Sequence, residues 1–314
     1  MEVSAFVIIS SILLVIETLV GLVANGFIAL MNYIDWFRSR KLSPNDQILT
    51  CLALSRLMWL AAVILNITAH YYSMDKHNCH YVYLMLPILW IFTNTSSTLF
   101  ATCLSVFYLT KIATFSHPVF LQVKLRFSGL VPWLLPSSVL LSAFTAIFLV
   151  TGLSNGFSMC DSNKSLLNIT DSGIKLPDLY MYIDILATVP NLIPLMIFLS
   201  SSILLLTSLW MHRRRMQRNG TGIQDLNTQV HLTAIKALAS FAVLYLSSFL
   251  AVIAQAVLIW NDMSGTWLFM LLSNVTVSSP SGHAVILILL NPTLKQAWIR
   301  MLLHLKCCSS EVPS

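Results

Sequence analysis

The stretch LFATCLSVFYLTKIATFSHPVF, residues 99–120, contains an apolar run that ends at a single cation. Apart from small polar residues, its first half is apolar enough for the interior of a lipid bilayer. Lys111 then follows with no acidic residue beside it, and the segment continues to Ser116, His117 and Pro118. A lysine at the end of a span can extend its ammonium group to the membrane surface. The pattern therefore predicts a membrane-spanning helix that reaches water at Lys111.

The composition of the whole chain supports a membrane protein. Of its 314 residues, 57% are hydrophobic and only 10% are charged. A soluble domain usually carries about a quarter charged residues, so these charges are too few to cover a water-facing surface. Lipid must therefore be the solvent for most of the protein. The net charge of +6 is confined to particular loops and forms no basic face, which argues against nucleic acid as a partner.

Seven runs in the sequence are long and apolar enough to span a bilayer, which takes roughly 20 apolar residues. Because a backbone in lipid must satisfy its own hydrogen bonds, we expect these runs to be helices. They cover residues 5–31, 47–71, 83–109, 127–150, 179–209, 232–259 and 267–290.

An amphipathic segment follows the last run. Apolar residues recur at helical spacing on one face of residues 294–305, and basic residues keep to the other side. This pattern predicts a helix that lies in the inner membrane interface. Cys307 and Cys308 at its end are candidates for palmitoylation, the alternative being a frayed tail with two unmodified thiols. We therefore expect an all-α membrane protein: one domain over residues 1–314, built as a seven-transmembrane helix bundle with a short amphipathic C-terminal helix.

The distribution of lysine and arginine predicts the orientation, because cytoplasmic loops carry an excess of both. One set of loops holds Arg38, Arg40, Lys41, Lys111, Lys124, Arg126, Arg213, Arg214, Arg215, Arg218, Lys295, Arg300 and Lys306. The opposite set holds only Lys76, Lys164 and Lys175. We therefore expect a multi-pass protein of the plasma membrane with an extracellular N-terminus and a cytoplasmic C-terminus.

Polar residues inside spans are costly, so each needs a reason to be there. Arg56, in LALSRLMWLAAVIL, must face the bundle interior, where the amide oxygen of Asn25 and carbonyls freed by Pro280 can accept from its guanidinium. We interpret this group as a structural and conformational clamp; the alternative is a substrate-ion site. His283 is either a satisfied packing group or a switch contact to the third or fifth span.

A second polar group lies in the outer halves of the second and third spans. Trp90 and Asn94 are spaced i, i+4 and so share one helix face, and Asn66 lies in the neighbouring span. An indole and two amides lining a cleft would hold an apolar molecule with a few hydrogen bonds. The alternative is that the amides only join helices.

The sequence gives no support for enzyme chemistry, a cofactor or a metal site. It contains no GxSxG elbow, HExxH, P-loop or paired intramembrane aspartates. A transporter is the more serious alternative, since broken helices in repeated halves mark that class. Pro190 and Pro194 interrupt one span, but no matching interruption is present in an equivalent half.

Several segments in order resemble the vertebrate bitter taste receptors, the type 2 taste receptor family of G-protein-coupled receptors. ATCLSVFYLTKIATFSHPVFLQVKLRF is similar to their third-span signature, and GLVANGFI and LALSR to their first and second spans. PSGHAVILILLNPTLKQA resembles their seventh span. The resemblance covers nearly the whole chain. It implies a receptor for small bitter-tasting molecules that activates a gustducin-type heterotrimeric G protein, with phospholipase C and calcium signalling.

The resemblance also implies roles for individual residues. Asn66, Trp90 and Asn94 match ligand-contacting positions of the family, and Ser248 and Ser273 occupy two further ones. A serine at 248 departs from the common tyrosine or phenylalanine, so an aromatic cage does not carry over.

At the cytoplasmic end, the resemblance implies that Tyr108 and Lys111 border the G-protein groove. Rhodopsin-like receptors have an acid–arginine pair there, whereas this chain has FYLTKIA, as bitter receptors do. A vomeronasal-type pheromone receptor is an alternative of similar architecture.

Two covalent features concern the second outer loop. Asn163 and Asn168 begin glycosylation sequons there, and Asn168 matches the acceptor asparagine of the family. Cys79 and Cys160 lie in extracellular segments, where the compartment permits a disulfide. Such a tether is common among rhodopsin-like receptors but is not a hallmark of bitter receptors, so the resemblance leaves the bond open.

Overall fold

The computed structural model describes residues 5–71, 79–113, 118–154, 176–218, 225–260 and 266–310, and these residues are almost entirely helical. The helices are α1 Ala5–Ser39, α2 Pro44–Tyr71, α3 Cys79–Ile112, α4 Pro118–Ser154, α5 Leu176–Arg218, α6 Asp225–Trp260, α7 Thr266–Leu290 and α8 Pro292–Ser310.

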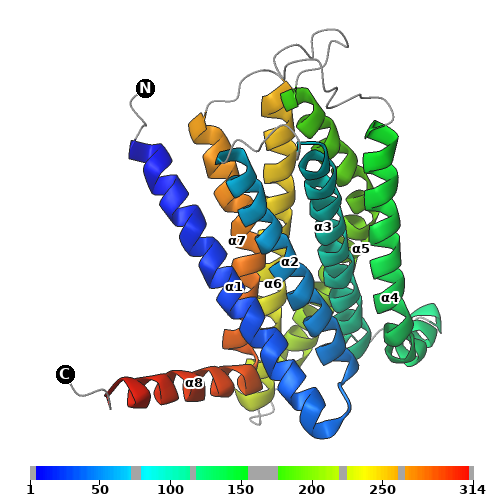
Figure 1. The fold of residues 1–314 in the computed structure, drawn as a ribbon. Coiled ribbons are helices and arrows are strands. Elements are labelled where there is room, and N and C mark those ends of the chain that lie inside the picture. The colour runs from blue at the N-terminus through cyan, green and yellow to red at the C-terminus, as the bar shows by residue number, and fades with distance from the viewer. Residues whose placement is uncertain are drawn as a thin grey trace, which may run out of the picture.

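The first seven helices lie side by side in a bundle, and α8 turns away from it along one end (Figure 1). The described N-terminus lies at the opposite end of the bundle from α8 (Figure 1). This arrangement confirms the predicted fold class, a seven-helix membrane bundle followed by a short C-terminal helix.

The helices continue beyond the apolar runs that marked them in the sequence. α5 extends over Leu176–Arg218 and α8 over Pro292–Ser310. α1 has 35 residues, which is about 50 Å at the rise of an α-helix and exceeds the roughly 30 Å of a hydrocarbon core. Hydropathy marks the part of a helix in lipid, whereas backbone hydrogen bonding carries the helix further into the interface.

Six helices in the described part of the chain are long and apolar enough to cross a membrane: α1, α2, α4, α5, α6 and α7. The described part of α3 does not meet that criterion, because it contains the hydroxyl-rich run TNTSST at residues 93–98. α3 packs against α2, α4 and α5, and Thr93 and Ser96 are buried. Their hydroxyls donate to the carbonyls of Leu89 and Phe92 at 2.8 Å in each case. α3 is therefore shielded from lipid by its neighbours and tolerates polar side chains.

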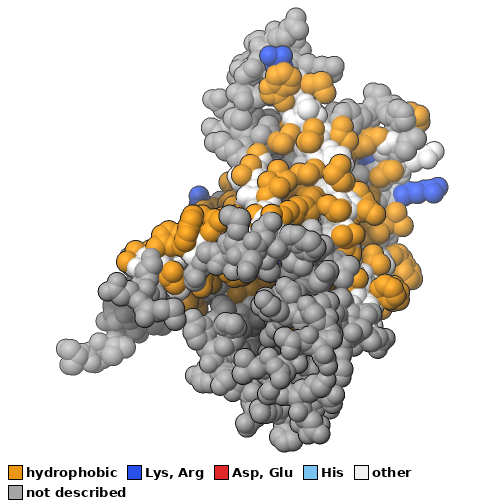
Figure 2. All heavy atoms as spheres, turned by 90° about the horizontal axis from the view of Figure 1, so that it is seen from above, with side chains coloured by type: hydrophobic (Ala, Val, Ile, Leu, Met, Phe, Trp, Pro, Cys, Tyr) orange, Lys and Arg blue, Asp and Glu red, His pale blue; other side chains and the backbone are white. Residues whose placement is uncertain are grey.

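The outer surface of the bundle is apolar, as lipid contact requires. On α4, Trp133 is 77% exposed and Leu140 is 71% exposed. Figure 2 shows hydrophobic side chains over most of the described surface seen from above. An apolar surface of this extent would be unfavourable in water, so lipid must cover it.

Two buried clusters fix the helices relative to one another. One contains residues of α2, α3, α4, α5 and α6, and Leu52, Leu104 and Phe198 are among its most buried members. The other joins α1, α2 and α7 to α8, where the rings of Phe27 and Trp298 meet edge to face at 4.9 Å between centroids. Close side-chain packing of this kind holds helices together in a bilayer, where lipid is as apolar as the core.

Candidate functional site

A cavity lies within the bundle between α2, α3, α5, α6 and α7, and its volume is about 80 Å³. Small-molecule sites usually measure about 300–1,000 Å³, so the cavity is narrow in this arrangement of the helices. The cavity is lined by Arg56, Trp59, Trp90, Asn94, Ser97, Thr98, Ala101, Thr188, Asn191, Tyr245, Ser248, Phe249, Val252, Thr276, Ser279 and Pro280. Aromatic and apolar side chains form part of the wall, and polar side chains from all five helices form the rest, so the cavity suits a compact ligand that has both apolar surface and hydrogen-bonding groups.

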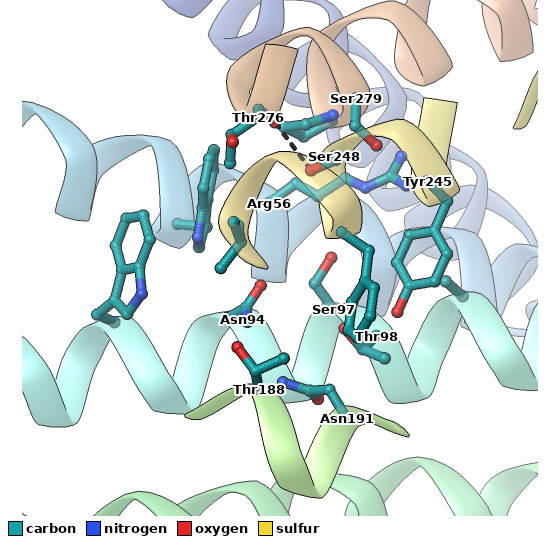
Figure 3. Close-up of a pocket in the computed structure, with 16 residues that line it drawn as sticks. Arg56, Asn94, Ser97, Thr98, Thr188, Asn191, Tyr245, Ser248, Thr276 and Ser279 are labelled. Carbon is teal, nitrogen blue, oxygen red and sulfur yellow. Dashed lines mark hydrogen bonds between the residues drawn. The ribbon is translucent and has the colours of Figure 1, made fainter. Parts of the chain in front are cut away.

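Three of the five predicted ligand-contacting residues line this cavity: Trp90, Asn94 and Ser248. The i, i+4 spacing on α3 places Trp90 and Asn94 on the same wall, and Figure 3 shows Asn94 opposite Thr188 of α5. The Trp90 ring packs on Trp59 of α2 with 5.2 Å between centroids.

The other two predicted residues are not among the lining residues. Ser273 lies further along α7, where its hydroxyl accepts from Gln255 Nε2 at 2.9 Å and donates to the carbonyl of Phe269 at 2.9 Å. Gln255 is on α6, so this contact joins α6 to α7. The side chain of Asn66 lies outside the described residues.

Proline chemistry explains how Ser248 is held. Pro280 has no N–H, so the carbonyl of Thr276, four residues earlier in α7, loses its helical partner. The Ser248 hydroxyl donates to that carbonyl at 3.3 Å across the α6–α7 interface, as the dashed line in Figure 3 marks. The serine at this position thus serves the helix interface while it lines the cavity.

Beneath the cavity, Arg56 contacts His283 of α7 in the core of the bundle. Arg56 is 4% exposed, and its Nη1 donates to His283 Nδ1 at 2.6 Å. Because the guanidinium only donates, the Nδ1 atom must accept, and the imidazole is neutral. The ring of His283 stacks on Phe241 of α6 at 3.7 Å between centroids and 22° between planes. One polar contact and one stacked pair therefore join α2, α6 and α7.

This geometry corrects the expected partners of Arg56 and His283. The amide of Asn25 donates to the carbonyls of Gly21 at 2.8 Å and Pro280 at 3.3 Å, so it joins α1 to α7 and does not accept from Arg56. The acceptor for Arg56 is His283, whose described hydrogen bond and ring stacking join it to the second and sixth spans, whereas the switch contact considered from the sequence was to the third or fifth. The expectation that Arg56 faces the bundle interior is confirmed by its burial.

A buried hydroxyl cluster between α3 and α5 was not predicted. Ser105 Oγ lies 2.7 Å from Ser201 Oγ and 3.0 Å from Ser202 Oγ, and Thr102 donates to the carbonyl of Pro194 at 3.0 Å. Short polar contacts of this kind join helices in a bilayer. The sequence signal for them was the run of serines in FLSSSILLL on α5.

At the C-terminal end of α3, Lys111 is exposed and Tyr108 is half-buried against the α3–α5 contact. Lys111 Nζ lies 5.8 Å from the centre of the Phe107 ring, and the structure gives it no carboxylate partner within the described residues. Lys124 of α4 donates to the carbonyl of Ala113 at 3.0 Å, so a second lysine caps the C-terminal end of α3. A cation there is favourable because the C-terminal end of a helix carries partial negative charge.

The remaining predictions fall outside the described residues. They concern Asn163, Asn168 and Cys160, and the side chains of Cys79, Cys307 and Cys308.

A bundle of seven helices in lipid, with a cavity between five of them and a buried polar contact beneath it, is the architecture of a seven-helix membrane receptor. The comparisons with known proteins agree with this class. A family model described as "Taste receptor protein (TAS2R)" matches residues 1–306. The chain therefore belongs to the type 2 taste receptor family, the bitter taste receptors among the G-protein-coupled receptors.

Individual relatives cover almost the same length. The chain is 35% identical to taste receptor type 2 member 3 of Papio hamadryas, over 90% of this chain and 89% of the relative. It is 34% identical to taste receptor type 2 member 7 of Rattus norvegicus, over 93% of each chain. It is also 35% identical to member 3 of Homo sapiens, over 90% of this chain and 89% of the relative. The protein is thus a multi-pass membrane receptor along its matched length.

Proposed function

We propose that the bundle cavity binds small bitter-tasting molecules from the extracellular side, and that binding activates a gustducin-type heterotrimeric G protein with phospholipase C and calcium signalling. The receptor acts in the plasma membrane with its N-terminus outside and its C-terminus in the cytoplasm. The uneven distribution of lysine and arginine between the two sets of loops supports this orientation.

One observation carries the proposal: Arg56 lines the cavity and also makes the contact that joins α2 to α7. A molecule in the cavity therefore touches the group whose partner, His283, stacks on α6. A ligand shifts a conformational equilibrium by its difference in affinity for the two states. A ligand that favours a different arrangement of Arg56 would change how α6 and α7 pack, and this is the link to the cytoplasmic end.

We assign ligand contacts to Trp90, Asn94 and Ser248, and keep Asn66 and Ser273 as further candidates. Trp90 supplies an aromatic wall and Asn94 an amide on the same helix face, opposite Thr188. An aromatic surface and a few hydrogen-bonding groups orient a small ligand without requiring charge.

At the cytoplasmic end, we assign the G-protein contact to the region around Tyr108 and Lys111. The exposed ammonium group of Lys111 lies at the end of α3, beside the contact between α3 and α5. Glycosylation of Asn168 or Asn163, a Cys79–Cys160 disulfide and palmitoylation of Cys307 and Cys308 remain predictions from the sequence.

A transporter is less well supported. Discontinuous helices would form its substrate site, but α5 continues as one helix from Leu176 to Arg218 through both Pro190 and Pro194.

A calcium assay tests the proposal. The chain is expressed in cells with a gustducin-type chimeric α subunit, and a library of bitter compounds is applied. We expect concentration-dependent calcium release that disappears when the α subunit is omitted. Responses that persist without it would exclude G-protein coupling, and transport of the compound would then be measured directly. Silence toward the whole library, with the receptor at the surface, would favour the pheromone-receptor alternative.

A further inference from the structure

We propose that a groove between α1 and α7, beside α8, binds an anionic phospholipid. One acyl chain lies in the groove, and the headgroup lies next to Lys295 of α8. The lipid comes from the leaflet on the side of α8. Its assignment to the cytoplasmic leaflet rests on the proposed orientation, whereas lipid binding itself requires neither that orientation nor signalling.

The groove is lined only by hydrophobic side chains. Four residues of α1 between Leu19 and Ala24, three of α7 between Val285 and Leu289, and Trp298 of α8 form its walls. Its volume is about 320 Å³, whereas the cavity inside the bundle measures about 80 Å³. Burying a polar group without a hydrogen-bond partner is costly. A space of this size among hydrophobic side chains therefore suits a hydrocarbon chain.

The groove opens toward lipid. Leu19 and Val23 of α1 are 55% and 57% exposed, and Leu289 of α7 is 54% exposed. These side chains belong to the apolar outer surface that lipid must cover, so the groove is continuous with the protein–lipid interface. A molecule that fills it therefore comes from the bilayer and needs no path through water.

The extent of the groove matches one leaflet. α8 lies along one end of the bundle (Figure 1), and its Trp298 ring meets Phe27 of α1 at 4.9 Å between centroids. Leu19 is eight residues earlier in α1 than Phe27, which is about 12 Å at the rise of an α-helix. Half of a hydrocarbon core is about 15 Å. An acyl chain that starts beside α8 can therefore fill the groove while its headgroup stays at the membrane surface.

Local structure fixes the part of the wall that α8 supplies. Pro292 begins the helix, and Asn291 caps it: Oδ1 accepts from the backbone N–H of Thr293 at 3.0 Å and of Leu294 at 3.4 Å. Leu294 is buried in the cluster that joins α8 to α1 and α7. The groove is therefore preformed, and binding a lipid carries no cost of ordering α8.

The charge of α8 favours an anionic headgroup. The helix contains no aspartate or glutamate, and its Lys295 and Arg300 are exposed. Lys295 is three residues before Trp298, so the two side chains are neighbours on the helix surface. Basic residues on an amphipathic helix attract anionic lipids. A sterol would also suit an apolar groove, but its single neutral hydroxyl group would leave the charge of Lys295 unused.

Thermal unfolding of the purified full-length receptor tests lipid binding without any signal. The receptor is held in detergent micelles, and phosphatidylserine replaces phosphatidylcholine with the same acyl chains at constant total lipid. A ligand that binds only the folded state raises the melting temperature in a saturable way. We expect a rise that saturates as phosphatidylserine is introduced. No change on replacement would overturn the proposal, and stabilisation by cholesterol in its place would identify a sterol site instead.

A pair of variants on α8 tests the headgroup position. Lys295→Gln should raise the apparent dissociation constant of phosphatidylserine about fivefold, the contribution of one lysine beside an anionic surface. Arg300→Gln removes the same charge from the same helix, but residues two apart do not face each other, so Arg300 does not lie beside Trp298. The control should therefore change the constant much less. Equal weakening by the two variants would mean a general attraction to the basic face and would overturn the headgroup site.

A second pair tests the acyl chain. Val23→Phe places a ring in the groove, so the apparent dissociation constant should rise at least tenfold. Val243→Phe is the matched control, because Val243 is 67% exposed on the outer side of α6 and does not line the groove. Each variant is compared with its own melting temperature in phosphatidylcholine, which separates lipid binding from basal stability. An unchanged constant for Val23→Phe would overturn the groove as the site. No agonist or G protein takes part, so this proposal and the proposed function fail separately.

Discussion

The contact between Arg56 and His283 gives the sharpest prediction about stability. The variant His283→Leu keeps a side chain of similar bulk and removes the acceptor for Arg56 Nη1, which lies 2.6 Å away. A hydrogen bond to a charged group contributes about 1.5–3 kcal/mol, and the lost ring contact with Phe241 adds about 0.5–1.5 kcal/mol. We therefore expect the free energy of unfolding to fall by about 2–4 kcal/mol, which would lower the melting temperature by roughly 5–10 °C.

Thermal unfolding of the purified receptor measures this effect, and His283→Gln is the control, because its amide oxygen can accept from Arg56. We expect His283→Gln to melt well above His283→Leu. A double-mutant cycle combines Arg56→Leu with His283→Leu. The double variant should lose about 1.5–3 kcal/mol less free energy of unfolding than the two single variants lose together, because neither partner is then left unpaired. If the leucine and glutamine variants melt together and the two changes are additive, the contact contributes nothing and the reasoning is wrong.

Three further predictions concern the cavity wall and the helix contacts. Trp90→Ala removes the aromatic wall of the cavity, so it should raise the half-maximal agonist concentration at least tenfold in the calcium assay. Surface labelling of the variant should stay at the wild-type level. Unchanged potency for several agonists would show that Trp90 is not part of the site. Gly21→Ala should lower stability by about 1–3 kcal/mol, because its Cβ would collide with Ser281 and Leu60, whereas Gly26→Ala meets nothing within 4 Å and should melt like the wild type. Ser105→Ala should lower the free energy of unfolding by about 1 kcal/mol, because the contacts with Ser201 and Ser202 of α5 are lost. The matched change Ser200→Ala should lower it less, because Ser200 is exposed and bonds within its own helix. Equal melting temperatures of the two variants would contradict this prediction.

Much of the fold could be predicted because helices in contact with lipid must be apolar, so their spans are easy to recognise in the sequence. Where a helix faces lipid, as α4 does at Trp133 and Leu140, nearly every residue is apolar and the run stands out. α3 is harder to recognise, because α2, α4 and α5 shield the hydroxyl run at residues 93–98 from lipid. Helix ends were the least predictable, since hydrogen bonding continues where hydropathy stops.

The candidate site was only partly predictable. Trp90 and Asn94 lie on one helix, so their spacing alone placed them on the same wall. The partner of Arg56 depends on how α7 is rotated against α2, and His283 is 227 positions away in the sequence. Trp59 was missed as a lining residue because a tryptophan in an apolar span resembles any other packing residue.

The measurement closest to the central claim is nucleotide exchange on a purified G protein. The receptor is reconstituted in lipid nanodiscs with a gustducin-type heterotrimer, and guanine nucleotide exchange is followed as agonist is added. The account predicts exchange that rises with agonist concentration and that needs at least tenfold more agonist with Trp90→Ala. Exchange that is independent of agonist, or equally sensitive to agonist when the cavity wall is removed, would contradict signalling from this cavity.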